Sequence, residues 1–178
     1  MNPEQLKYPI GHFEKPEHIT RGHIARWIDE ISTFPDRLKD TVENLSDAQL
    51  NTSYRPGGWT IRQVVHHCAD SHANSIIRFK LALTEDAPVI KPYFEDRWAE
   101  LEDSRKMPIE SALYMLQGIH KRWTVLLRSL TEEQLSRTFI HPEHGKSFRL
   151  DENIGVYAWH GNHHLAHITG LKEREGWS

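Results

Sequence analysis

The chain has 178 residues and a formal net charge of −3 with its histidines counted neutral. This length fits one domain covering residues 1–178, and the mixed charges, without a basic block, argue against a nucleic-acid partner. No apolar run approaches the roughly 20 residues that span a bilayer, the N-terminus lacks a signal-peptide pattern, and Cys68 is the single cysteine, so we expect a soluble cytoplasmic protein without an internal disulfide.

Two helices are predicted in the first half of the chain. Apolar residues recur at spacings of three and four from about Ile19 to Leu45, but Pro35 interrupts them, so we expect a kink or a local break just before it. The second helix starts after "RPGG", where Thr60 can cap it and Gln63 can complete a capping box. Its apolar stripe consists of Ile61, Val65, Cys68, Ile76, Phe79 and Leu83.

Two more helices are predicted in the second half. One follows Pro108, a residue that suits a first helical turn, and the other begins near Asp151 and has an apolar stripe that fades near Gly170. Few segments alternate as strands do, and "SFRL" can form at most a short one. The connection from about Thr84 to Pro108 is too long for a tight hairpin, so it is expected to cross over. Four long amphipathic helices predict an all-α four-helix bundle.

The chain contains 13 histidines against one cysteine, so a metal site would use nitrogen and oxygen ligands. In "WHGNHHLAH", His160 and His164 are four residues apart and lie one above the other on a helix, whereas His163 is expected to point toward solvent. Gly161 replaces the glutamate of the His-Glu-x-x-His motif, which argues against a peptidase. The spacing suits a chelating pair and a half-buried polar pair equally well.

Catalytic zinc sites typically have three protein ligands and an open position. A third candidate is His67 in "WTIRQVVHHCADSH", since His66 points the other way around the helix, although periodicity alone does not exclude it. His67 shares a polar stripe with Ser71, Asn74 and Arg78. This stripe is either a solvated flank or the lining of a polar pocket in which these side chains bind an anionic substrate group.

Other polar residues are interpreted as structural. His120 falls on the core face of the third helix, which favours a hydrogen-bonded core histidine, and His72 lies near the core face without a clear partner. His141 and His144 occupy a loop and are expected to be solvated. Asp70 is either a surface carboxylate or an acceptor that orients an imidazole.

Six segments together are similar to one known family: "YPIG", "GGWTIRQVVHHCADSH", "IRFKLALTED", "HKRWTVLLRSLT", "WHGNHHLAHI" and the terminal "GWS". The chain resembles the DinB/YfiT group of bacterial metal-binding proteins, most closely the YfiT-type proteins named as metal-dependent hydrolases. In that family the first ligand follows the tryptophan by eight positions, which selects His67, and the other ligands correspond to His160 and His164. The resemblance implies a DinB-like bundle with crossover topology, one zinc or nickel ion per subunit, and a cytoplasmic homodimer.

Three neutral imidazoles leave the full charge on such an ion, which can lower the pKa of bound water to about 7 and can deprotonate a thiol. The resemblance implies a metal-dependent hydrolase that acts on a small molecule. Some relatives resemble thiol S-transferases that use bacillithiol or a similar low-molecular-weight thiol. A non-catalytic metal carrier or sensor would explain the surplus of histidines. A DNA-damage-related binding protein is suggested only by the family name, and the missing basic patch opposes it.

Overall fold

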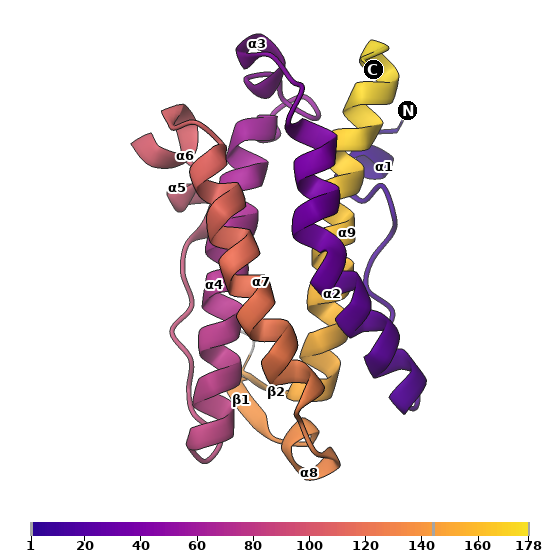
Figure 1. Cartoon of the computed structure of the whole chain (residues 1–178), viewed down its shortest axis with the longest axis vertical. Helices are drawn as coiled ribbons and strands as arrows, with labels where there is room; N and C mark the ends of the chain where they lie inside the picture. Colours follow the sequence, from indigo (N-terminus) through magenta and orange to yellow (C-terminus); the bar gives the residue numbers. More distant parts are fainter. Residues whose placement is uncertain (1, 144, 178) are drawn as a thin grey trace.

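Four long helices form the framework of the protein, whose computed structural model describes residues 2–143 and 145–177 (Figure 1). They are α2 (Arg21–Val42), α4 (Ile61–Thr84), α7 (Glu110–Arg128) and α9 (Leu150–Glu175). Both α2 and α4 pack against α7 and α9. The predicted four-helix bundle is therefore confirmed, with α2 and α4 placed across the bundle from each other although they are consecutive long helices in the sequence.

The crossover explains this arrangement. Figure 1 shows α2 and α9 running in one direction and α4 and α7 in the other, so the parallel helices α4 and α7 need a long return connection. Residues 85–109 supply it along the outside of the bundle, and they contain α5 (Glu95–Trp98) and α6 (Glu102–Lys106). The expected crossover is present, and it brings α9 beside α4 as an antiparallel neighbour.

Short elements complete the fold. They are α1 (Pro3–Lys7), α3 (Asp47–Leu50), α8 (Glu132–Leu135), β1 (Thr138–His141) and β2 (Lys146–Arg149). The short strand expected at "SFRL" is β2. It pairs with β1, a strand that the sequence pattern did not predict, and Phe139 lies opposite Phe148 in this antiparallel hairpin. No helix in the described part of the chain is long and apolar enough to cross a membrane.

Helix α2 continues through Pro35, so the local break is wrong, while the alternative, a kink before Pro35, stays a prediction. Proline has no N–H and cannot donate to the carbonyl of Ile31 one turn earlier. His120 of α7 donates to this carbonyl instead, with an Nδ1 to oxygen distance of 2.5 Å. A side chain from the neighbouring helix thus satisfies the carbonyl that proline leaves free. Helix α9 continues to Glu175, past the fading of its apolar stripe near Gly170.

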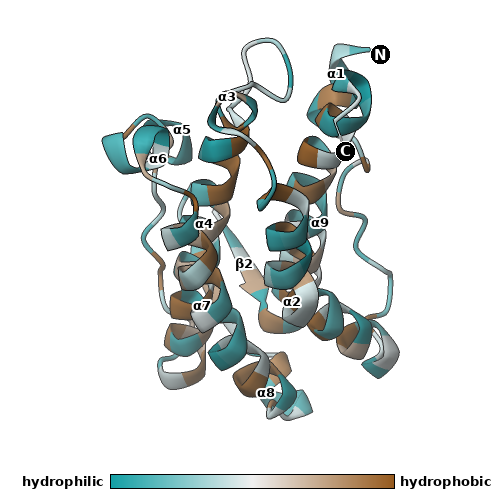
Figure 2. Ribbon diagram, turned by 45° about the horizontal axis from the view of Figure 1, so that its top comes forward, coloured by the Kyte–Doolittle hydropathy of each residue, from teal (hydrophilic) through white to brown (hydrophobic). Residues whose placement is uncertain are grey.

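The hydrophobic core consists of two buried clusters with a polar layer between them. Each long helix carries both hydrophobic and hydrophilic residues along its length (Figure 2). Ala69 of α4 and Ile168 of α9 belong to the first cluster, and Phe79 of α4 and Ala158 of α9 belong to the second. His72 and the four histidines of α9 fall between these positions, whereas His66 and His67 precede Ala69 and lie beside the first cluster. The candidate functional residues therefore lie in the middle of the bundle.

Candidate metal centre

The predicted capping box sets the rotation of α4 about its axis. The Gln63 N–H donates to Thr60 Oγ1 at 3.2 Å, and the Thr60 N–H donates to Gln63 Oε1 at 2.9 Å. Gln63 Nε2 also donates to the carbonyl of Ala99 at 2.8 Å, so the same side chain fastens the crossover to the start of the helix. About two turns later His67 faces the interior and is only 4% exposed.

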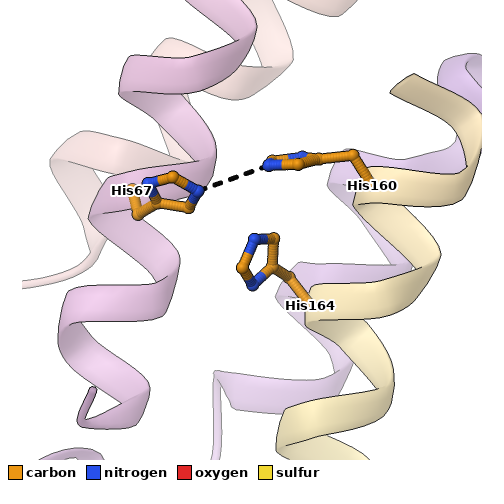
Figure 3. Close-up of side chains that lie close together, drawn as sticks. All are labelled: His67, His160 and His164. Atoms are coloured by element: carbon orange, nitrogen blue, oxygen red, sulfur yellow. Dashed lines mark hydrogen bonds between the residues drawn. The ribbon is translucent and has the colours of Figure 1, made fainter. Parts of the chain in front are cut away.

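His67 on α4 and His160 and His164 on α9 point toward one another (Figure 3). Each offers one ligand nitrogen, and these three atoms lie within 4.8 Å of one another. The Nε2 atoms of His67 and His160 are 3.3 Å apart, and the buried Nδ1 of His164 has no hydrogen-bond partner among the described residues. Converging imidazole nitrogens suit zinc and nickel, so this donor set fits the ion that the family resemblance implies.

Burial keeps the three imidazoles neutral. Loss of solvent, together with a smaller effect of the nearby His163, lowers the pKa of His67 to about 4. Burial, followed by repulsion from His67 and other neighbouring histidines, lowers the pKa of His160 and of His164 well below the ordinary value. A protonated imidazole cannot bind a metal, so these shifts leave the ligand nitrogens available near pH 7.

Two cavities meet at His160. The larger has a volume of about 550 Å³, and its lining includes Ser71, Arg78, Tyr93, Asn153 and Tyr157. The smaller has a volume of about 310 Å³, and its lining includes Tyr8, Trp59, His67, His163 and His164. Glu95 and Asp96 of the crossover line both cavities together with His160. The candidate metal centre therefore lies between two spaces that can each receive a small molecule.

The polar stripe predicted on α4 is only partly directed at this site. Ser71 and Arg78 line the larger cavity, and the Ser71 hydroxyl is 3.5 Å from His160 Nε2. Arg78 Nε is buried without a hydrogen-bond partner in the described chain, which leaves a donor for a substrate. Asn74 instead donates from Nδ2 to the carbonyl of Asp70 at 2.9 Å, and it is not among the residues that line this cavity.

Several histidines lie elsewhere than the sequence indicated. His163 is 7% exposed rather than solvated, because the N-terminal segment covers it and the Tyr8 ring lies 5.8 Å from its own. His141 is half-buried and lines the larger cavity, while His144 lies outside the described residues. His66 faces away from the centre, with Nε2 3.3 Å from the carbonyl of Met107.

Sequence reasoning missed two residues beside the centre. Glu95 follows Pro92 in the crossover, and partial burial, with the charges of Asp96 and Glu143, raises its pKa. His72 lies next to His160, with 3.1 Å between Nε2 of His72 and Nδ1 of His160. The only sequence signal for His72 was its position near the core face. The other candidate for orienting an imidazole, Asp70, has no side-chain hydrogen bond to a histidine within the described residues, and burial raises its pKa to about 6.

Known proteins share both the sequence and the fold. The sequence model of the DinB superfamily matches residues 30–168. A protein of Oceanobacillus iheyensis, "Putative metal-dependent hydrolase OB0782", is 56% identical over 171 residues, which cover 96% of this chain and 98% of that one. "Putative metal-dependent hydrolase YfiT" of Bacillus subtilis is 49% identical over 178 residues, 100% of both chains.

Solved structures lead to the same family. The structure of YfiT from Bacillus subtilis matches with a TM-score of 0.96 and 50% identity over 98% of this chain and 99% of that one. That protein is described as a probable metal-dependent hydrolase with an unusual four-helix bundle topology. A mycothiol-dependent maleylpyruvate isomerase matches with a TM-score of 0.63 and 14% identity over 80% and 59% of the two chains, and it shares the fold alone. The resemblance to the DinB/YfiT group is confirmed.

Proposed function

The chain belongs to the DinB superfamily, and from this premise we propose that it is a metal-dependent hydrolase of small molecules. The proposed centre is mononuclear and is held by His67, His160 and His164. The observation that carries the proposal is the convergence of three neutral imidazoles within 4.8 Å of one another beside a cavity of about 550 Å³. The names of the bacillary relatives support a metal-dependent reaction.

Zinc or nickel in this position would supply Lewis-acid chemistry, since it lowers the pKa of a water or thiol placed beside it. The chain itself would bind and orient the substrate. Among the described residues, neither the buried Nε–H of Arg78 nor the buried amide N–H of Asn153 at the same cavity has a partner, so each can donate to a substrate, Arg78 to an anionic group. Glu95, which lines both cavities, is our candidate for accepting a proton, because its raised pKa makes its carboxylate a stronger base than an ordinary glutamate.

A second candidate function is thiol transfer, and the presence of two cavities favours it. A hydrolase needs one organic substrate, whereas a transferase must hold a thiol and an electrophile together. The cavities on either side of His160 provide separate places for these two molecules. In this version a low-molecular-weight thiol such as bacillithiol would occupy one cavity, and the electrophile would lie against Ser71 and Arg78 in the other.

The metal assignment is tested on protein purified without a histidine tag. We expect about one zinc or nickel ion per chain and a sharp loss of metal in His67→Ala. His66→Ala is the matched control, because it removes the neighbouring histidine, which is also buried but faces Met107. Full metal content in His67→Ala, or an equal loss in both variants, would contradict the proposed ligands.

The reaction is tested by turnover of small esters, amides and electrophiles with and without added thiol. A hydrolase should cleave esters or amides without thiol and should be inhibited when thiol is added. Turnover that depends on thiol would select the transferase instead. Metal loading that follows supply without either activity would favour a carrier or sensor and would overturn the enzyme assignment.

The family resemblance also implies a homodimer in the cytoplasm, and we retain both as proposals. Light scattering on the purified protein should then give twice the mass of the 20.8 kDa chain. A monomeric mass at micromolar concentration would contradict the dimer.

A further inference from the structure

Three histidines from three sequence segments form a continuous line inside the bundle. His160 Nδ1 lies 3.1 Å from His72 Nε2, and His72 Nδ1 lies 2.7 Å from His120 Nε2. His120 Nδ1 then lies 2.5 Å from the carbonyl oxygen of Ile31. The line thus runs from α9 through α4 and α7 to the backbone of α2, and each of its contacts has hydrogen-bonding distance.

The carbonyl at the end of the line determines where every proton lies. A carbonyl oxygen only accepts, so His120 Nδ1 must carry a proton, and a neutral His120 then has an unprotonated Nε2. His72 must donate to this Nε2 from its own Nδ1, which leaves His72 Nε2 as an acceptor. His160 must therefore donate from Nδ1, and its Nε2 keeps a free lone pair. This Nε2 is the atom that lies 3.3 Å from His67 Nε2 (Figure 3).

We propose that His72 and His120 are positioning residues, which hold His160 in the tautomer and ring orientation that direct its Nε2 lone pair at the candidate metal centre. The inference rests on the proposed function in that it takes His160 as a metal ligand. The order of the protons follows from the hydrogen bonds and needs no metal. A ligating histidine usually donates its other ring N–H to an oxygen acceptor, and here a second histidine replaces that oxygen.

The surroundings of the line hold it neutral and rigid. His72 and His120 are each 1% exposed. Burial lowers the pKa of His120 to about 4 and that of His72 well below its ordinary value, so neither ring is charged near pH 7. The Phe34 ring packs against both, with centroid distances of 5.2 Å to His72 and 5.7 Å to His120. A buried, fully paired row of this kind has one favourable arrangement of protons.

Pro35 gives the line its fixed end. In an uninterrupted helix the N–H of residue 35 would donate to the carbonyl of Ile31. Proline removes that donor, and His120 takes its place. Pro35 thereby leaves the Ile31 carbonyl of α2 without its helical donor, and this buried carbonyl accepts the hydrogen bond from His120 of α7.

The first test reads the tautomers directly. Nitrogen-15 NMR of the histidine-labelled, metal-free protein distinguishes Nδ1–H from Nε2–H rings. We expect His160, His72 and His120 all to be neutral Nδ1–H tautomers at pH 7. An Nε2–H tautomer at any of the three would overturn the proposal. This readout does not depend on metal or turnover, so it separates the proposal from the proposed function.

The second test measures zinc affinity in variants of His72. His72→Leu fills the space but removes the acceptor for His160, and it should weaken zinc binding by about 10–100-fold, the usual effect of losing such a partner. His72→Gln should recover most of the affinity, because its side-chain oxygen reaches about as far as the imidazole Nε2. His66→Leu is the control, since it removes a buried histidine from the same helix outside the line.

The outcomes are distinct. Equal zinc affinities in His72→Leu and His66→Leu would overturn the positioning role, as would a Gln variant as weak as the Leu variant. If His72→Leu does not fold, the NMR measurement on the unaltered protein still decides. Absence of zinc binding in the unaltered protein would refute the proposed metal centre, whereas the order of protons would still be decided by NMR.

Discussion

Gly161 follows the candidate ligand His160 on α9 and faces Phe34 of α2, so replacing it by alanine tests how closely these two helices pack. A methyl group at this position would come within 2.9 Å of Phe34 Cδ2 and 3.2 Å of its Cγ. Carbon atoms do not approach so closely, so the ring or the helix must shift. Phe34 is 1% exposed, and its other neighbours include the rings of His72 and His120, so it has no free space to enter.

Two opposing terms set the size of the effect. Alanine in place of glycine in a helix interior stabilises the fold by about 0.8–1.0 kcal/mol. Overpacking of a filled core costs about 1–3 kcal/mol. Gly161→Ala should therefore lower the free energy of unfolding by about 0–2 kcal/mol. Gly118 on α7 is exposed and has no atom within 4 Å of an added Cβ, so Gly118→Ala should raise it by about 1 kcal/mol.

Urea denaturation of the metal-free variants, followed by circular dichroism, measures both free energies of unfolding. The difference between the two variants isolates the steric term, because both gain the same helix propensity. We expect Gly161→Ala to be less stable than Gly118→Ala by about 1–3 kcal/mol. Equal stabilisation by the two alanines would refute the packing argument. The same contact explains why a glutamate of the His-Glu-x-x-His type has no room at this position.

Three further predictions concern metal, pH and the thiol. The metal-free protein should unfold cooperatively, and zinc at a hundred times its dissociation constant should raise the free energy of unfolding by about 2.7 kcal/mol. A metal-free protein without a thermal transition would contradict this prediction. Burial lowers the pKa of His120 from 6.5 to about 4 in the folded state. Between these pH values the unfolded chain therefore binds a proton that the folded chain does not. Urea titrations should show that the free energy of unfolding is highest above about pH 6.5 and falls toward pH 4 by about 1.4 kcal/mol per pH unit for each such histidine. A free energy of unfolding that does not change over this range would contradict the argument. Cys68 is 0% exposed and burial raises its pKa, so thiol reagents should label it only after unfolding, and rapid labelling of the native protein would count against its burial.

Local patterns in the sequence were sufficient for the elements themselves. Apolar spacing predicted the four helices, and Thr60 with Gln63 predicted where α4 begins. Both depend on residues within one or two turns of each other, so they can be read without knowing the fold. The His160 and His164 pair is local in the same sense, because residues four apart lie on one helical face.

The tertiary structure decided which faces meet. Periodicity placed His163 toward solvent, but the N-terminal segment folds back over it, and no pattern within α9 contains that information. Pro35 predicted a kink or a local break because the donor to the Ile31 carbonyl is missing from its own helix, and the helix stays continuous because His120, distant in sequence, supplies another donor. His72 had no visible partner until α4 was packed against α7 and α9. Helix formation follows from contacts three and four residues apart, whereas the histidine layer depends on contacts between helices that the crossover brings together.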